Sequence, residues 1–347
     1  MRCIIRSLWL LAVCCLLPAL VGCTPTVTNS GGSGAAKPKP TVAYVTNGIA
    51  AFWVVAAKGA EAAARDADVD LLVRMPPDGV GDQKRMVQEL LTQGVDGIAI
   101  SPIDPDNQAD LLDEIADNSI LITQDSDAPK SKRRCYIGMD NYLAGRMCGQ
   151  MIKEAIPDGG EVMLFVGRLE QLNARQRRQG IIDELLDRSS DPTRYDPTGK
   201  PLKGDRYTVL DTRIDQFDFG KAKALAQDAI ASNPQLKCMV GLFSYNAPKC
   251  LEVVRHAGKL GQIKIVSFDE ERDTLQGITD GEIYGTIVQN PYNYGYDSVR
   301  VLAALARGED KALPDSKFVD IPARKIKKDN VQQFWAELKK LTGDDKN

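Results

Sequence analysis

The residues best suited to chemistry in this sequence are polar and aromatic side chains that follow short apolar segments. They are Asn47, Phe52, Trp53, Asp125, Arg175, Asn246, Asp269 and Gln289. Carboxylates accept hydroxyl protons, an arginine donates two hydrogen bonds in a fixed geometry, and amides do both. Aromatic rings cover apolar C–H surfaces at little entropic cost. Such a set suits a neutral ligand that carries many hydroxyl groups.

Each of these residues also has a purely structural interpretation. An Asp or Asn after a strand often caps the next helix or forms a turn, which applies to Asp125, Asn246 and Asp269. Trp53 could belong to the core. Arg175 lies in the run 175–178, most of which is expected to be a solvated helix surface. The ordered set as a whole, more than any member, favours a binding site.

The sequence gives little indication of an enzyme. The only histidine, His256, is expected near the end of a surface helix, so a Ser-His-Asp triad or a histidine-rich metal site is not indicated. Neither a P-loop nor a Gly-x-Gly-x-x-Gly pattern follows the first strand. Asp125 and Asp269 could serve as the acid and base of a glycosidase. A neighbouring arginine is expected to keep both ionised, whereas the acid needs a raised pKa. We therefore expect no enzyme, no cofactor and no metal.

The elements that must position these residues alternate between strand and helix. The expected strands are short, continuous apolar runs, as in parallel sheets with helices on both faces. They cover 42–46, 69–73, 95–100, 120–123 and 134–138 in the first half, then 162–166, 207–210, 238–243, 263–268, 283–288 and 319–321. Residues 187–205 form a polar surface excursion. The fold class is α/β, with two doubly wound parallel-sheet lobes whose ligand lies at the carboxyl ends of strands.

The stretch Arg134–Tyr142 is where one lobe passes into the other. Its strand ends at Gly138, and Asp140 and Asn141 are suited to cap the next helix. A return crossing is expected at 289–290, where Pro291 stops the strand, and a third near Ser316. The first lobe then comprises 41–139 plus 290–316, and the second 140–289 plus 317–347.

The N-terminus predicts export. Arg2 and Arg6 precede an apolar run, 8–17, that is too short to span a membrane. The run leads to Leu-Val-Gly-Cys, ending at Cys23, which resembles the bacterial lipoprotein box and implies lipidation of that thiol. An ordinary secretory signal is the alternative. Residues 1–22 are thus a signal peptide, and 23–40, rich in Ser, Gly, Thr and Pro, a flexible tether.

Length, charge and cysteine content limit the number of domains, the class of partner and the kind of cysteine site. The chain has 347 residues, 43% of them hydrophobic, which allows two full cores. A formal net charge of −3 gives no bias toward nucleic acid. Cys135, Cys148, Cys238 and Cys250 remain in the mature chain, spaced too widely for a metal or redox motif. An exported protein permits disulfides among them, but all four lie within expected strands or helices, where cysteine is often a small buried apolar residue.

Six segments taken together resemble the ribose/galactose-type periplasmic binding proteins of bacterial ABC sugar importers. They are 41–53, 121–125, 136–149, 174–180, 243–246 and 266–289. The similarity runs from about Thr41 to Ile321. The resemblance implies a type I periplasmic binding fold with a three-crossing hinge. It assigns to the sugar site the aromatic residues Phe52, Trp53 and Phe217 and the polar residues Asp125, Arg175, Asn246, Asp269 and Gln289.

Two positions depart from the ribose-binding pattern. Ser126, which we assign to the ligand-binding site with its neighbour Asp125, stands where those proteins have an arginine, and Ala50 stands where they have an asparagine. The site therefore lacks the guanidinium and the amide that form hydrogen bonds with the sugar in ribose binders. Different sugar hydroxyl groups can be hydrogen-bonded, so a sugar other than ribose is compatible with the site.

The resemblance also implies the partners. We expect a monomer, lipid-anchored in the periplasm or on the outer face of a bacterial membrane, that binds a small sugar and delivers it to an ABC transporter permease. A sensor that presents the sugar to a membrane receptor or kinase is an alternative. The related DNA-binding repressor is disfavoured by export and by the absence of a DNA-reading helix pair before Thr41.

Overall fold

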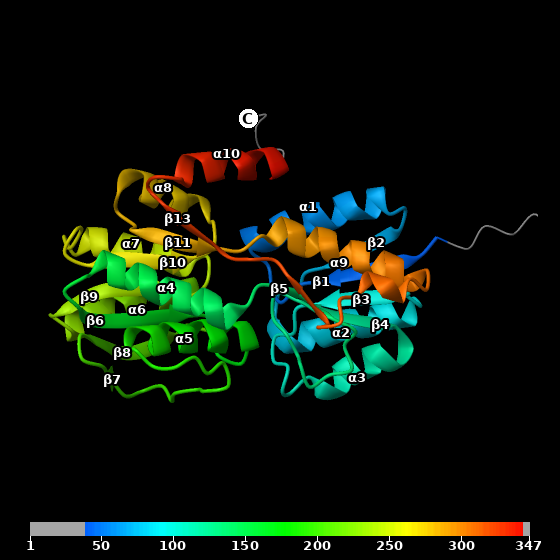
Figure 1. The fold of residues 1–347 in the computed structure, drawn as a ribbon, viewed down its shortest axis with the longest axis horizontal. Helices are drawn as coiled ribbons and strands as arrows, with labels where there is room; N and C mark the ends of the chain where they lie inside the picture. The colour runs from blue at the N-terminus through cyan, green and yellow to red at the C-terminus, as the bar shows by residue number, and fades with distance from the viewer. Residues whose placement is uncertain (1–38, 343–347) are drawn as a thin grey trace, which may run out of the picture. The chain divides into compact units, whose positions relative to one another are not determined.

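The computed structural model describes residues 39–342 (Figure 1). They belong to one compact unit that begins at Lys39. Within these residues, no helix is long and apolar enough to cross a membrane. Helices and strands alternate along the chain and form two separate sheets, each covered by helices on both faces.

The first sheet has six strands in the order β12-β5-β4-β3-β1-β2, and every pair is parallel. The strands are β1 (Thr41–Val45), β2 (Asp70–Arg74), β3 (Gly97–Ile100), β4 (Ile120–Gln124), β5 (Tyr136–Gly138) and β12 (Phe318–Asp320). One face packs against α1 (Ala51–Asp66) and α9 (Pro291–Ala306). The other packs against α2 (Gly79–Thr92) and α3 (Ala109–Asn118). A short 3-10 turn, η1 (Asp310–Ala312), follows α9.

The second sheet has seven strands in the order β13-β11-β10-β9-β6-β8-β7. Its parallel strands are β6 (Gly160–Val166), β8 (Tyr207–Ile214), β9 (Leu236–Gly241), β10 (Lys264–Phe268) and β11 (Gly285–Val288). The two edge strands, β7 (Leu202–Lys203) and β13 (Arg324–Lys327), are antiparallel to their neighbours. α4 (Asn141–Ala155) and α5 (Leu172–Leu185) cover one face. The other face carries α6 (Phe219–Ser232), α7 (Asn246–His256), α8 (Arg272–Asp280) and α10 (Val331–Thr342).

Successive residues of a strand serve opposite cores, which explains why these strands are continuously apolar. In β6, Val162 and Leu164 pack in the core beneath α4 and α5, whereas Met163 and Phe165 pack on the opposite face. A side-chain period of two places every second residue on each face, and here both faces are buried.

The chain crosses between the sheets three times. The first crossing, Met139–Asp140, links β5 to α4, and the second, Gln289–Asn290, links β11 to α9. The third crossing, predicted near Ser316, is misplaced. β12 pairs with β5 in the first sheet, so the chain leaves that sheet only after Asp320, at 321–323.

The start of α4 is well defined and brings that helix close to α5. Asp140 caps α4 by accepting a hydrogen bond from the backbone N–H of Leu143 (2.9 Å), as predicted. One turn later, a Cβ atom at Gly145 would lie 2.3 Å from the carbonyl oxygen of Arg177. Only glycine permits this approach, and the contact fixes the backbone of Arg177.

The four cysteines of the described chain are free and buried, so none of them forms a disulfide. Burial raises the pKa of Cys135 to about 11 and that of Cys238 to about 12. All four behave as small apolar core residues.

Candidate ligand-binding site

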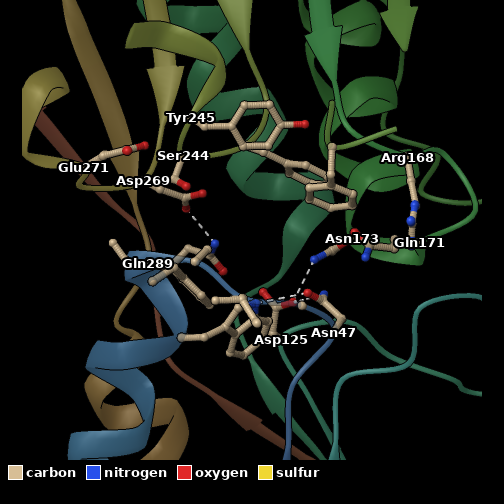
Figure 2. Close-up of a pocket in the computed structure, with 18 of the residues that line it drawn as sticks. Asn47, Asp125, Arg168, Gln171, Asn173, Ser244, Tyr245, Asp269, Glu271 and Gln289 are labelled. Atoms are coloured by element: carbon tan, nitrogen blue, oxygen red, sulfur yellow. Dashed lines mark hydrogen bonds between the residues drawn. The ribbon is translucent and has the colours of Figure 1, made fainter. Parts of the chain in front are cut away.

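A cleft of about 400 Å³ is lined by loops that belong to both sheets (Figure 2). Of the residues expected from the sequence, the cleft brings together Asn47, Phe52, Trp53, Asp125, Phe217, Asp269 and Gln289. Asn47 and Asp125 come from loops of the first sheet, and Phe52 and Trp53 from the first turn of α1. Phe217 and Asp269 come from loops of the second sheet, while Gln289 lies on a crossing. These loops follow the carboxyl ends of strands, the usual place for ligands in open α/β sheets.

Asp125 follows β4 in a left-handed backbone conformation (φ 57°). Its Oδ2 atom accepts three hydrogen bonds, from Ser101 Oγ (3.0 Å), Asn173 Nδ2 (3.1 Å) and Asn47 Nδ2 (3.4 Å). Asn173 lies in the first turn of α5, in the second lobe, so this bond connects the two lobes. The Oδ1 atom lies 3.8 Å from Arg177 Nη2 and is the oxygen left for a ligand.

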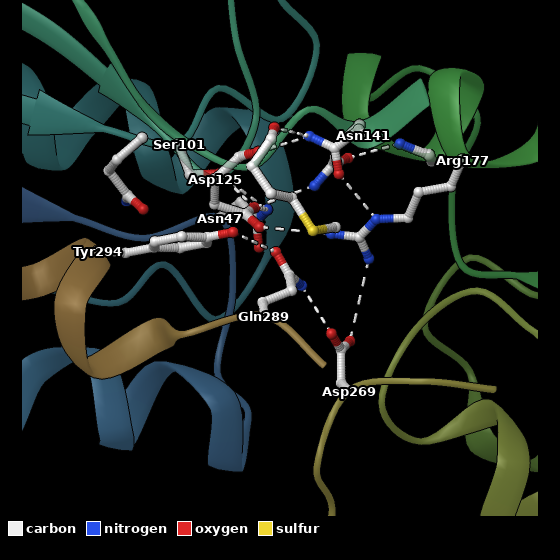
Figure 3. Close-up of polar contacts among 12 residues, drawn as sticks. Asn47, Ser101, Asp125, Asn141, Arg177, Asp269, Gln289 and Tyr294 are labelled. Carbon is white, nitrogen blue, oxygen red and sulfur yellow. Dashed lines mark hydrogen bonds and ion pairs between the residues drawn. The ribbon is translucent and has the colours of Figure 1, made fainter. Parts of the chain in front are cut away.

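Arg177 occupies the centre of the polar network in Figure 3. Its side chain is 1% exposed and is held by Nε–H donating to Asn141 Oδ1 (2.9 Å) and Nη1 donating to the Leu242 carbonyl (3.1 Å). The guanidinium also lies 4.9 Å from the Phe268 ring centroid. Nη2 makes no hydrogen bond to any residue within 39–342. A buried donor without a partner destabilises by about 1–3 kcal/mol, which a ligand oxygen would relieve.

The second carboxylate, Asp269, follows β10 and is also left-handed (φ 72°). Its Oδ1 atom accepts a hydrogen bond from Gln289 Nε2 (2.6 Å), and Oδ2 lies 4.0 Å from Arg177 Nη1. Gln289 in turn accepts a hydrogen bond from the Tyr294 hydroxyl (3.1 Å). The crossing residue is therefore fixed by one side chain from each lobe.

Burial dominates the electrostatics of this cleft. It raises the pKa of Asp125 to about 6, with Arg177 opposing the rise and Asp269 adding to it. Burial also raises the pKa of Asp269, again against Arg177 and the Gln289 hydrogen bond. The sequence predicts that a neighbouring arginine prevents a raised pKa at both carboxyl groups. This prediction is wrong, because desolvation raises the pKa of each by more than Arg177 lowers it. Asp125 nevertheless remains mostly ionised at neutral pH.

Aromatic side chains form two walls of the cleft. Phe52 and Trp53 meet edge to face (centroids 4.8 Å apart), and the indole N–H donates to Asn47 Oδ1 (3.0 Å). From the other lobe, Phe217 stacks on Phe243 (5.5 Å, 13°). All four residues line the cleft, so flat apolar surfaces flank the polar network.

Three residues predicted for the site lie outside this lining. Arg175 is not among the residues that line the cleft, and it pairs instead with Asp106 (Nη1 to Oδ2, 3.1 Å), so the structure does not place it in the site. Asn246 is buried, and its amide supports Asp215 (3.1 Å) and the backbone N–H of Phe243 (3.0 Å). Ser126 is buried next to Asp125, but it does not reach the cleft surface.

Several cleft residues are absent from the sequence-based set, notably Arg168, Gln171, Asn173, Arg177, Tyr245 and Glu271. Helical spacing identifies one of them. Arg177 lies three residues after buried Ala174 and four before buried Ile181, which places it on the inward face of α5. Gln171, 1% exposed, has a side-chain Nε2 without a hydrogen-bond partner within the described chain. It precedes the helix, where spacing gives no signal.

The family model described as a periplasmic binding protein domain matches residues 41–310. The ribose import binding protein RbsB of Salmonella typhimurium is 24% identical over 279 residues, which cover 80% of this chain and 88% of that protein. The D-ribose/D-allose-binding protein of Pseudomonas aeruginosa is 22% identical over 322 residues, covering 88% and 95%.

A solved structure gives the same result. An ABC transporter solute-binding protein from Burkholderia graminis, in complex with D-arabinose, is 26% identical. The match covers 84% of this chain and 96% of that one, with a TM-score of 0.75. With a family model spanning most of its length and these relatives, the chain belongs to the periplasmic binding proteins and is a type I sugar-binding member.

Proposed function

We propose that this protein captures a monosaccharide in the cleft and delivers it to an ABC transporter. One observation carries the proposal: Arg177 lies between a carboxylate of each lobe and has an N–H group that finds no hydrogen-bond partner among residues 39–342. A sugar hydroxyl can donate to Asp125 or Asp269 while its oxygen accepts from Arg177. The aromatic walls suit the apolar faces of the ring.

The ligand class is a neutral pentose or hexose. In the first lobe, Ser126 stands in place of the arginine of ribose binders, so that donor is missing. The buried amides of Gln171 and Asn173 supply hydrogen-bond donors from the second lobe instead. Two relatives are named for ribose or for ribose and allose, and the solved structure contains D-arabinose. Ribose and arabinose are pentoses that differ in the configuration of one hydroxyl-bearing carbon, and allose is a hexose. A site built on fixed donors discriminates strongly between such isomers.

Isothermal titration calorimetry tests the proposal directly. Residues 39–347 are titrated with D-ribose, D-allose, D-arabinose, D-xylose, D-glucose, D-galactose and xylitol. We expect one or two of these ligands to bind with a Kd in the micromolar range or below. Absence of binding by the whole panel would contradict the proposal.

Binding without turnover is favoured over hydrolysis. The Oδ2 atom of Asp125 is saturated by three donors, which suits a fixed acceptor better than a group that must exchange protons during catalysis. Delivery is favoured over sugar sensing because some relatives, such as RbsB of Salmonella typhimurium, are named as import binding proteins.

The proposal includes a lipid anchor at Cys23, a residue outside the described part of the chain. Its support is the sequence: a charged and apolar leader ends at Cys23, and a polar tether follows. Mass spectrometry of the mature N-terminus should find a diacylglycerol on Cys23. The Cys23→Ala variant should accumulate as an uncleaved precursor; a mature chain that begins elsewhere without lipid would exclude the anchor.

A further inference from the structure

The loop between β8 and α6 adopts an unusual backbone conformation next to the cleft. Gln216 and Phe217 are both left-handed, with φ of 62° and 63°. Each such residue costs on the order of 1–3 kcal/mol, and such strain gathers at functional sites. The backbone N–H groups of Gln216 and Phe217 donate to the Gly167 carbonyl (2.8 Å) and Asp215 Oδ1 (2.9 Å). The loop is thus held in a fixed shape.

Asp215 joins this loop to the start of α7. The side chain is 1% exposed and accepts hydrogen bonds from the Tyr245 hydroxyl and from Asn246 Nδ2. Burial raises the pKa of Asp215, while these bonds oppose the rise. Asn246 therefore orients Asp215, and Asp215 fixes Phe217 and Tyr245 relative to each other.

The result is a continuous row of aromatic rings that runs beyond the polar network. Phe243 stacks on Phe217, Phe217 lies 5.8 Å from Tyr245, and Tyr245 lies 4.9 Å from Phe219. Phe219 is 53% exposed and still lines the cleft. From the first lobe, Ile49 (65% exposed), Pro76 and Pro77 line the same cleft. These lining residues are aromatic or apolar, in contrast to the polar network around Arg177. Two cations lie against the row: Arg168 is 5.0 Å from the Phe217 ring centroid, and Lys249 Nζ is 5.7 Å from that of Phe219.

We infer that Phe219 and Tyr245, with Ile49, Pro76 and Pro77, form an outer subsite that binds a second ring attached to the sugar. The ligand class is a glycoside whose second ring, saturated or aromatic, presents a flat apolar face. A cleft of about 400 Å³ falls in the range of roughly 300–1,000 Å³ that holds ligands larger than one sugar ring. The inference rests on the proposed function, because the inner sugar anchors the second ring.

Calorimetry with matched glycosides tests the outer subsite. The free sugar that binds best in the panel is compared with its methyl and phenyl glycosides. We expect the phenyl glycoside to bind roughly three- to tenfold more tightly than the methyl glycoside, through aromatic contact with Phe219. In Phe219→Ala this ratio should fall to about one. Leu143→Ala, equally exposed on α4 and outside the cleft lining, should keep the wild-type ratio.

The outcomes separate this inference from the proposed function. If the free sugar binds but both glycosides fail to bind, the cleft closes on a lone monosaccharide and the outer subsite is excluded. An unchanged ratio in a folded Phe219→Ala protein, checked by its thermal unfolding, would also overturn it. If no sugar binds in any form, the proposed function fails and the subsite with it.

Discussion

Arg177 is the residue on which sugar binding is expected to depend most. It is buried between Asp125 and Asp269, and its removal would leave both carboxylates without their shared cation. Loss of one partner from a buried charged hydrogen bond costs about 2–5 kcal/mol. Arg177→Ala should therefore raise Kd at least about thirtyfold in calorimetry.

Arg175→Ala is the matched control, two residues away on the same helix. Its half-exposed ion pair with Asp106 is worth at most about 1 kcal/mol, so Kd should change no more than about fivefold. If Arg175→Ala weakened binding as much as Arg177→Ala, the position of the arginine in this site would be wrong.

Asp125 makes binding dependent on pH. Its pKa is raised to about 6, so at pH 5 only roughly a tenth of it is ionised. The ligand is expected to donate a hydroxyl proton to the ionised form. Affinity should therefore fall about tenfold from pH 8 to pH 5, and binding at pH 6 should release protons, measurable as buffer-dependent heats.

Folding stability should show the opposite dependence on pH in the ligand-free protein. A carboxyl group whose pKa is raised by folding binds its proton more tightly in the folded state. The free energy of unfolding should therefore decrease as pH rises from about 4 to about 6. In Asp125→Asn this decrease should be smaller; an identical slope would show that Asp125 does not titrate there.

At the level of single residues, the sequence could predict which strand ends supply the site but not every side chain that reaches it. Asp125, Asp269 and Gln289 were predictable because a residue at the end of a strand has a nearly fixed position. The arginine was not assigned correctly, because the choice between Arg175 and Arg177 depends on the rotation of α5 against the sheet. Gln171 and Tyr245 lie in loops, where no periodicity fixes the direction of a side chain.

Among the structural elements, the contact between α4 and α5 controls the position of Arg177. A methyl group at Gly145 would press on the Arg177 carbonyl, so Gly145→Ala should lower the free energy of unfolding by about 1–3 kcal/mol and also weaken sugar binding. Gly81, in α2, has no atom within 4 Å of its Cβ position. Gly81→Ala should instead stabilise by about 0.4–1 kcal/mol.

Urea denaturation of both glycine variants provides the measurement. A Gly145→Ala protein as stable as the wild type would mean that the two helices can move apart at no cost. Unchanged sugar binding in a destabilised Gly145→Ala protein would separate helix packing from the placement of Arg177.

The elements that the sequence analysis missed share a physical cause. β13 reads Arg-Lys-Ile-Lys, and only Ile326 is buried, because it is an edge strand with one packed face. β7 has two residues and lies inside the polar excursion 187–205. Apolar runs predict central strands, and edges lack such runs.

For the whole molecule, three crossings allow the lobes to rotate, and a ligand that contacts both should favour the closed arrangement. Its contacts would include Asp125 from the first lobe and Asp269 from the second. Small-angle scattering should show a smaller radius of gyration at saturating sugar than without sugar. Arg177→Ala at the same sugar concentration should not compact. An unchanged radius for the saturated wild type would count against closure.

Because the native cysteines are buried and react slowly, the motion of the lobes can be followed with dyes attached to introduced cysteines. Cysteine reacts as its thiolate, and a thiol whose pKa is about 11, as in Cys135, contains on the order of a few hundredfold less thiolate than an exposed one. Residues 39–342 can therefore carry two introduced cysteines, at exposed Glu114 on α3 and Gln227 on α6, without replacement of the native four. Maleimide dyes would react at those two positions, and energy transfer between them would follow the opening and closing of single molecules.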